Sequence, residues 1–253
     1  MPLDTSEIDK HTSRASRIAE LRSTPADARP APTGKYRLLS RLRSYFVFAP
    51  LIWLYTVVMG LLSLPTSVFS NSGRVQHDFA RVWAWLIMKT IFSPVTVMGL
   101  EKIDTTRPHV YAVNHGSALD IPVLYVHLPF QFRIAFKKEL LKYPIVGWHL
   151  RRSGQVCIDQ QNPAGSIGAI RSARKRLKRG FLAIKSQVDV VPVALVGTYE
   201  LLPMDTYHIK CRPLEMRVGE PISTAVLTLD EMDTLSAKVQ SAMEELYYAN
   251  ETP

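Results

Sequence analysis

A histidine and an aspartate five positions apart, His115 and Asp120, are the side chains whose types and spacing could carry out chemistry. They belong to the run NHGSALD (114–120), directly after an apolar stretch typical of a strand. Histidine has an ordinary pKa near 6.5 and is the usual general base for a hydroxyl, while a carboxylate on its second nitrogen fixes the tautomer and stabilises the imidazolium. The pair is half of a catalytic triad without an enzyme nucleophile. It therefore predicts direct attack by a substrate hydroxyl, with no covalent enzyme intermediate.

The same run admits a structural explanation. A histidine and an aspartate at this spacing occur by chance in many chains, and Ser117 suits the N-cap of a helix beside an ordinary loop histidine. The chemical interpretation gains support from position, because open α/β sheets bind their ligands at the carboxyl ends of strands.

Short β-rich runs alternate with helical runs through the middle of the chain. The strand-like runs are VYAVN (110–114), FRIAF (132–136), QVCID (155–159) and VVPVALVG (190–197). This rhythm predicts βαβ units, and hence an α/β fold with a mostly parallel sheet and flanking helices. An extended stretch (211–222) and an amphipathic helix from about Leu229 to Tyr248 complete it. The rhythm breaks once: a second helical run (181–187) follows the basic helix 166–180, so a strand is absent where one is due.

The N-terminal part differs in character. Residues 1–34 mix charge with Ser, Thr, Pro and Ala, which predicts a flexible tail. No charged residue occurs between Arg43 and Arg74, and Tyr45 to Leu64 is nearly all apolar, so a helix there would be about 30 Å long and could cross a bilayer. Residues 35–92 are therefore expected to form a membrane-associated helical region that precedes the α/β domain.

Three interpretations of that region stay open: a true span, a helix seated in the membrane interface, and a buried core helix. Pro50 and Gly60 weaken a straight span, and the segment 81–99 pairs Trp83 and Trp85 with apolar faces as an interfacial helix would. Basic residues crowd the front edge of the apolar run and place that end on the cytoplasmic face: Lys35, Arg37, Arg41 and Arg43.

Composition narrows the classes of partner. The chain has 253 residues, 47% of them apolar, and a formal charge of +9, which predicts a folded protein with an anionic partner. Seven Lys or Arg and no acid lie between Gln160 and Val188, but no nucleic-acid-binding signature accompanies them, so no nucleic acid is expected. Cys157 and Cys211 stand far apart without metal-ligand spacing; both are expected to be reduced and buried, and no metal site is expected.

Four ordered blocks carry a family resemblance: NHGSALD, AFKKEL, GWHLRRSGQVCID and VVPVALVGTYELLP. Together they resemble the 1-acylglycerol-3-phosphate O-acyltransferase (lysophosphatidic acid acyltransferase) family over roughly residues 93–248, within an α/β domain at 93–253. A membrane-seated N-terminal helical motif also belongs to this family.

The resemblance implies a phospholipid-biosynthesis enzyme that acylates lysophosphatidate to phosphatidate. Its acyl donor would be a thioester of coenzyme A or acyl carrier protein, with no further cofactor. His115 and Asp120 would form the catalytic dyad, and Asn114, Ser117 and Lys137 would contact substrate, Lys137 matching a family lysine assigned to phosphate. Backbone N–H groups at the start of the helix at Ser117 are expected to stabilise the oxyanion.

Two departures from the family pattern concern the acceptor phosphate. Gln160 stands where the family usually has an arginine after Ile-Asp. The family's third block, a strand ending in Phe-Pro-Glu-Gly-Thr-Arg and a loop, is absent between Gly180 and Phe181, where the strand rhythm also breaks. The acceptor site is therefore expected to be incomplete. A second hypothesis follows: a catalytically impaired homologue that binds only membranes or lipids.

Overall fold

The structure is a computed structural model that describes residues 34–69, 73–159, 188–204, 206–225 and 232–249. Residues 1–33 of the predicted tail lie outside this part. The predicted basic helix also lies outside this part, as does the position after Gly180 where the family's third block is expected to be missing, because both fall within residues 160–187.

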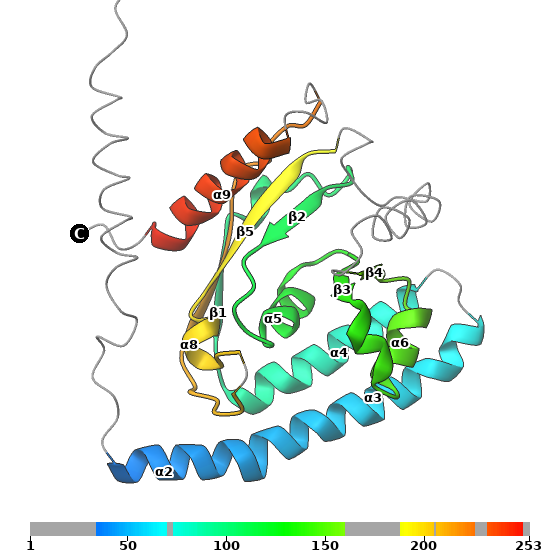
Figure 1. Cartoon of the computed structure of the whole chain (residues 1–253), viewed down its shortest axis with the longest axis vertical. Helices are drawn as coiled ribbons and strands as arrows, with labels where there is room; N and C mark the ends of the chain where they lie inside the picture. Colours follow the sequence, from blue (N-terminus) through cyan, green and yellow to red (C-terminus); the bar gives the residue numbers. More distant parts are fainter. Residues whose placement is uncertain (1–33, 70–72, 160–187, 205, 226–231, 250–253) are drawn as a thin grey trace, which may run out of the picture.

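The described strands form two separate sheets (Figure 1). The larger sheet has the order β1-β6-β5-β2, in which the pairs β1–β6 and β2–β5 are parallel and β5–β6 is antiparallel. The smaller sheet is the parallel pair β3–β4. The strands are β1 (Val95–Met98), β2 (Val110–Val113), β3 (Ala135–Lys137), β4 (Val156–Ile158), β5 (Val190–Val196) and β6 (Leu214–Val218). The α/β class and the mostly parallel pairing predicted from the strand rhythm are confirmed.

Helices cover both faces of the larger sheet. In Figure 1, α9 lies along one face, while α5, α4 and the long N-terminal helix follow one another on the other side. The helical elements are α2 (Gly34–Arg43), the π-helical turn η2 (Ser44–Phe48), α3 (Ala49–Phe69), α4 (Arg74–Ile91), α5 (Asp120–His127), α6 (Val146–Arg152), α8 (Thr198–Leu201) and α9 (Met232–Tyr248), with short 3-10 turns η3 (Leu100–Lys102) and η4 (Lys138–Lys142).

The core lies between the larger sheet and helices α4 and α5. Val191 and Val193 of β5 are fully buried, as are Ala84 and Ile91 of α4. With Ala80 and Ile87, these α4 residues recur at a spacing of three or four, which gives the helix one apolar face toward the sheet. Arg81 of α4 fixes the end of α5 by donating hydrogen bonds to the carbonyl oxygens of residues 125, 128 and 130 at 3.1, 2.6 and 3.3 Å. These bonds satisfy carbonyls that a helix end leaves without partners.

Two expectations for residues 81–99 are wrong. Helix α4 ends at Ile91, and residues 95–98 form strand β1, because the Ser93-Pro94 step disfavours helix and the following residues VTVM favour an extended chain. Trp83 does not face outward: its indole N–H donates to Thr56 Oγ1 at 3.0 Å, which ties α4 to α3. Trp85 is 49% exposed, as expected of an interfacial side chain.

The apolar run forms one long helix, with α2, η2 and α3 end to end. The π-helical turn comes just before Pro50, which has no N–H and whose ring would collide with the carbonyl four residues earlier in a regular helix. One helix in the described chain, Leu38–Thr66, is long and apolar enough to cross a membrane by length and composition. Only 11% of its most apolar stretch is buried, so the core-helix interpretation is wrong.

The long helix has two different faces. Its inner face packs on the protein: Tyr55 is hydrogen-bonded to Thr90 of α4 at 3.1 Å, and Ser63 to the Nδ1 of His149 of α6 at 2.7 Å. A Cβ at Gly60 would collide with the Ile145 side chain, so glycine permits this close approach. We call the other side the outer apolar face; its exposed residues include Leu38, Leu42, Phe46, Trp53, Leu54, Val57 and Leu61.

Candidate active site

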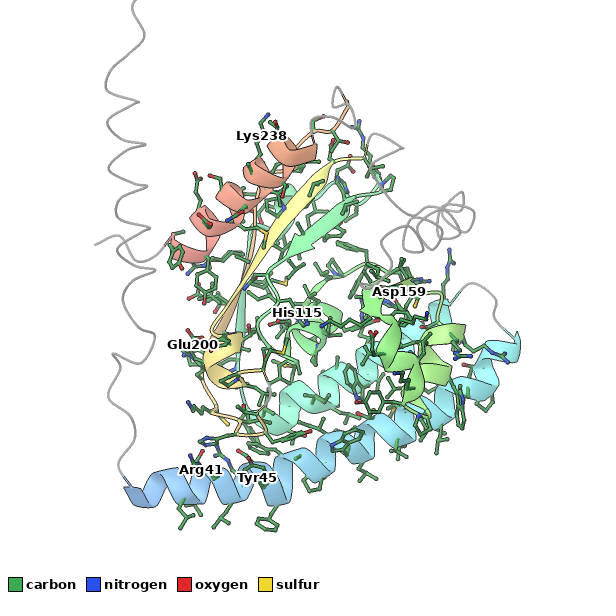
Figure 2. The ribbon with its side chains drawn as sticks, viewed as in Figure 1. Arg41, Tyr45, His115, Asp159, Glu200 and Lys238 are labelled. Carbon is green, nitrogen blue, oxygen red and sulfur yellow. The ribbon has the colours of Figure 1, made fainter. Side chains whose placement is uncertain are left out.

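The pair His115–Asp120 lies where β2 ends and α5 begins. Figure 2 shows His115 in the interior of the view, between β2 and α5. His115 follows β2 by two residues, and Asp120 is the first residue of α5. The Nδ1 of His115 lies 2.9 Å from the Oδ2 of Asp120, so the contact expected from the spacing is present.

The carboxylate of Asp120 is held by the turn that precedes it. Its Oδ2 accepts the backbone N–H of Gly116 at 3.0 Å and of Ser117 at 2.9 Å, besides the contact with His115. The Asp120 side chain is 2% exposed and that of His115 57%. A buried carboxylate with three donors on one oxygen stays fixed, so it orients the imidazole while the ring remains open to a substrate.

This geometry sets the tautomer. Because Asp120 accepts from Nδ1, the proton of the neutral ring lies on Nδ1 and the lone pair on Nε2. An imidazole in this state can take a proton from a hydroxyl through Nε2, and Asp120 then stabilises the cation.

One expectation about this turn is wrong. The N–H groups of Gly116 and Ser117 donate to Asp120, and the helix begins at Asp120 rather than at Ser117. These two groups are therefore not available to stabilise an oxyanion.

Asn114 ties the end of β2 to β5. Its side-chain Nδ2 donates to the Leu195 carbonyl at 2.9 Å, and its Oδ1 accepts the Leu195 N–H at 2.7 Å. The amide thus continues the β2–β5 pairing by one residue and sets where His115 emerges. Ser117 is fully buried, and its Oγ accepts the Leu119 N–H at 3.2 Å. Contact of Asn114 and Ser117 with substrate remains a prediction.

Lys137 ends β3 in the smaller sheet and is exposed. The structure does not place it among the residues that line the cavity beside His115. Its neighbour Lys138 forms an ion pair with Asp159 at 3.0 Å, and this hydrogen bond raises the pKa of Lys138. A phosphate contact by Lys137 remains a prediction.

The two cysteines do not form a disulfide. Both are free, but Cys157 is half-buried and Cys211 is exposed, so the expectation that both would be buried is wrong. Among the described residues, no group of three or more His, Cys, Asp or Glu side chains converges as metal ligands.

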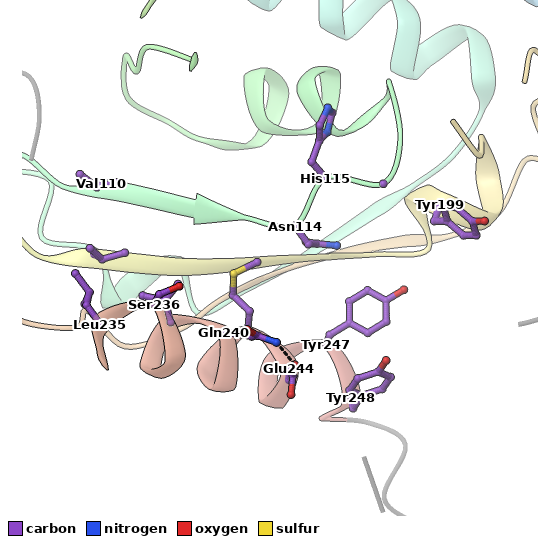
Figure 3. Close-up of a pocket in the computed structure, with 14 residues that line it drawn as sticks. Val110, Asn114, His115, Tyr199, Leu235, Ser236, Gln240, Glu244, Tyr247 and Tyr248 are labelled. Atoms are coloured by element: carbon purple, nitrogen blue, oxygen red, sulfur yellow. Dashed lines mark hydrogen bonds between the residues drawn. The ribbon is translucent and has the colours of Figure 1, made fainter. Parts of the chain in front are cut away.

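A cavity of about 680 Å³ opens next to the pair, between α9 and strands β2 and β5 (Figure 3). His115 and Gly116 line one end of it, together with Tyr199 of α8. Sequence reasoning did not include α9 or Tyr199 in the site. The available signal was the spacing of four in α9, where residues 235, 239, 243 and 247 all line the cavity.

The site therefore combines a His-X4-Asp pair at the end of a strand of a mostly parallel α/β sheet with a mainly apolar cavity beside it. Residues 94–192 match the family model described as Acyltransferase. The chain is thus similar to acyltransferases, and among its relatives are proteins named 1-acyl-sn-glycerol-3-phosphate acyltransferases, as the sequence blocks indicated.

Several curated relatives carry that name. A chloroplast enzyme of Arabidopsis thaliana is 27% identical over 233 residues, which cover 78% of this chain and 65% of that protein. An enzyme of Saccharomyces cerevisiae is 23% identical over 237 residues, 82% of this chain and 77% of that one. The chain spans less than two thirds of the length of the first two relatives, at 65% and 61%.

The crystal structure of the 1-acyl-sn-glycerophosphate acyltransferase PlsC from Thermotoga maritima has the same fold. It matches with a TM-score of 0.66 and 21% identity, over 86% of this chain and 97% of that one.

Proposed function

We propose that the protein transfers a fatty acyl group from a thioester donor to the free hydroxyl of lysophosphatidate, giving phosphatidate. The donor is an acyl thioester of coenzyme A or of acyl carrier protein. The observation that carries the proposal is the contact between His115 Nδ1 and the buried Asp120 carboxylate at 2.9 Å, on the end of a strand beside an apolar cavity. The names of the relatives support the choice of substrates.

The reaction follows from the tautomer. Nε2 of His115 takes the proton of the acceptor hydroxyl as its oxygen attacks the thioester carbonyl. The C–S bond then breaks, and the imidazolium returns the proton to the leaving thiolate. Asp120 stabilises the imidazolium between these steps and is not itself protonated.

We further propose that the protein lies on the cytoplasmic face of a membrane, with the outer apolar face of α2–α3 in the lipid interface. The inner face of the same helix packs against α4 and α6, so lipid cannot surround it as it would surround a lone span. A one-sided apolar helix is typical of interfacial seating. The exposed Arg41 and Arg43 at its start suit anionic headgroups.

The test is acyl transfer by the full chain on vesicles that contain lysophosphatidate, with labelled acyl-CoA and acyl carrier protein supplied in parallel. His115→Ala should lower the rate by about 10²–10⁴-fold, because it removes the general base. His127→Ala, a histidine at the other end of α5, is the matched control and should retain the rate.

The impaired-homologue hypothesis predicts a different result. It predicts vesicle binding without transfer from either donor, and no difference between the unmodified chain and His115→Ala. The intact pair and the enzyme names of the relatives favour the active enzyme.

A further inference from the structure

The chain between α8 and β6 returns to the long N-terminal helix. We refer to its described residues, 202–204 and 206–213, as the α8–β6 loop. In Figure 1 this part of the chain runs from α8 to the long helix, near the end of α2. Ser44, the first residue of η2, is buried there; its Oγ accepts the Ile209 N–H at 3.1 Å and lies 3.2 Å from the Ile209 carbonyl oxygen. The loop is thereby fixed to the helix through its backbone.

Two side chains of the loop also contact the start of the helix. The Nε2 of His208 lies 3.0 Å from the Oγ of Ser40. The rings of Tyr207 and Tyr45 are tilted against each other, with their centroids 6.4 Å apart. The loop and the start of the helix therefore form one continuous surface.

The tyrosine pair lies beside the outer apolar face of the helix. Leu42 belongs to that face, and Tyr45 follows it by three residues, so the two side chains are neighbours on the helix surface. Tyr45 and Tyr207 are 51% and 57% exposed, and Met204 of the loop is 40% exposed. Tyrosine suits a membrane interface, where its ring is buried and its hydroxyl stays in water. The loop thus extends the outer apolar face with side chains typical of an interface.

The same surface carries an excess of positive charge. Arg41, Arg43 and Lys210 are exposed, and the Arg43 guanidinium donates to the sulfur of Cys211 at 3.4 Å, next to Lys210. Figure 2 shows Arg41 on the helix below the loop. The loop sequence adds one acid, Asp205, which the three cations outnumber. An anionic lipid surface matches both features, because its negative potential attracts Lys and Arg and its interface accepts the apolar side chains. An acidic protein would match the cations alone.

The loop also holds α8, which lies beside the catalytic pair. Arg212 forms an ion pair with Glu200 of α8 at 3.6 Å. Tyr199 of α8 lies against Gly116, the residue after the catalytic histidine, where a Cβ would be 3.5 Å from the tyrosine side chain. A lipid surface in contact with the loop therefore lies at a fixed height relative to the catalytic pair.

We propose that the α8–β6 loop is a second membrane-binding element: Met204 and Tyr207 enter the interface of an anionic lipid surface beside Tyr45, and Lys210 pairs with lipid phosphate. The inference rests on the proposed seating of the outer apolar face in the membrane. A single helix that lies in the interface leaves the molecule free to roll about the helix axis. A second contact, from a distant part of the chain, fixes that rotation and hence the direction in which the catalytic pair faces the membrane.

The first test measures the environment of the loop through Cys211, which is exposed. A nitrobenzoxadiazole label on Cys211, in protein that carries Cys157→Ser, should shift its emission to the blue when vesicles of phosphatidylcholine and phosphatidylglycerol are added, because the label leaves water. A nitroxide near the lipid headgroup should quench this emission more than a nitroxide at the end of the acyl chain. The same label at Ser241→Cys, in protein without the other two cysteines, is the control and should stay in water, since α9 lies on the other face of the sheet.

A label at Leu54→Cys, on the outer apolar face, separates this inference from the proposed seating of the helix. If the label at position 54 enters the lipid and the label at 211 stays in water, the helix is seated and the loop assignment is wrong. If the label at 211 enters the lipid and the label at 54 does not, the loop binds and the proposed seating of the helix is wrong. If both labels stay in water, both proposals are wrong.

The second test needs no label. Lys210→Glu should weaken binding to the anionic vesicles by about tenfold or more, because each basic side chain near such a surface changes the affinity about fivefold and the reversal changes the charge by two. Lys238→Glu, on the exposed side of α9, makes the same change in net charge and should have a smaller effect. On vesicles of phosphatidylcholine alone the two variants should bind alike. Equal losses on the anionic vesicles would show that net charge, and not a contact of the loop, governs binding, and would overturn the proposal.

Discussion

Asp120 acts on His115 through an oxygen that also accepts two backbone N–H groups. This arrangement links the spacing of the motif to its chemistry, because the turn at Gly116 and Ser117 brings the carboxylate back to the histidine that precedes it. The carboxylate is buried and acts through the histidine, so Asp120 is a positioning residue.

Asp120→Asn should lower kcat by about 10²–10⁴-fold with little change in KM. An amide oxygen can still accept the N–H groups of the turn, but an amide does not stabilise the imidazolium as a carboxylate does. Steady-state kinetics with lysophosphatidate measure the split. A fall in kcat/KM caused entirely by KM would show that Asp120 holds substrate instead.

His77 is the buried histidine of the core, 1% exposed, and it packs against the rings of Tyr125 and Phe132. Burial, followed by the charges of Arg133 and Arg81, lowers the pKa of His77 to about 4. The unfolded chain binds this proton near pH 6.5 and the folded chain only near pH 4. The contribution of neutral His77 to stability is therefore complete above pH 6.5 and is lost as the pH falls from there toward 4.

The protonation of His77 at low pH should lower the free energy of unfolding by about 3 kcal/mol. Urea unfolding near pH 7 and near pH 4.5 measures it, and His77→Phe should show a smaller difference between the two conditions because it has no proton to bind. Equal differences for the two proteins would mean that His77 is not the group responsible.

At the scale of elements, we expect the outer apolar face of α2–α3 to bind the membrane. Leu54 and Leu61 are 54% and 47% exposed, so their replacement leaves the packed face intact. The double variant Leu54→Glu, Leu61→Glu should bind anionic vesicles about a hundredfold less, since burying one leucine is worth about 1.5–3 kcal/mol. Vesicle flotation measures this, with Ala237→Glu, Ser241→Glu on the exposed side of α9 as the control of equal charge. Equal loss in both variants would indicate a general charge effect.

The elements that the sequence predicts well are those specified locally. The NHGSALD run and the strand before it combine pattern and position, so β2 and the pair at its end could be placed from a few residues. Strand β1 could not be predicted in this way, because VTVM follows an apolar helix closely and the partner strand β6 lies more than a hundred residues away. The cavity wall on α9 was missed for the same reason: its residues meet His115 only through the fold.

At the scale of the whole molecule, the division into two sheets is the feature that local patterns did not predict. The βαβ rhythm runs from β2 through β3 to β4, yet β2 pairs with β5 and the β3–β4 pair stands apart. Among the described strands, β2 has one neighbour, and its other edge is a row of N–H and C=O groups without a strand partner. A two-stranded sheet of three-residue strands is marginally stable by itself. The break in the strand rhythm after residue 180 is consistent with this division.

The arginine that the family usually has at the position of Gln160 can be tested through the binding of the acceptor. Gln160→Arg should lower the KM for lysophosphatidate by about ten- to a hundredfold, because a charge-assisted hydrogen bond is worth about 1.5–3 kcal/mol. Gln161→Arg adds the same charge one position later and should have a smaller effect. If both variants behave alike, general charge rather than a specific contact governs acceptor binding.

Restoring a strand tests the division of the sheet itself. We expect that inserting the family's third block after Gly180, as a strand ending in Phe-Pro-Glu-Gly-Thr-Arg and its loop, supplies a partner for the free edge of β2. Roughly two to four new backbone hydrogen bonds, at about 1 kcal/mol each, should raise the thermal midpoint by roughly 5–10 °C. The gain should appear as one cooperative transition, since a strand between β2 and the β3–β4 pair would join the two sheets. A Gly-Ser insert of equal length is the control, and it should leave the midpoint unchanged or lower it. Equal midpoints for the two inserts would show that the edge of β2 does not accept this strand and that the molecule is stable with its sheets apart.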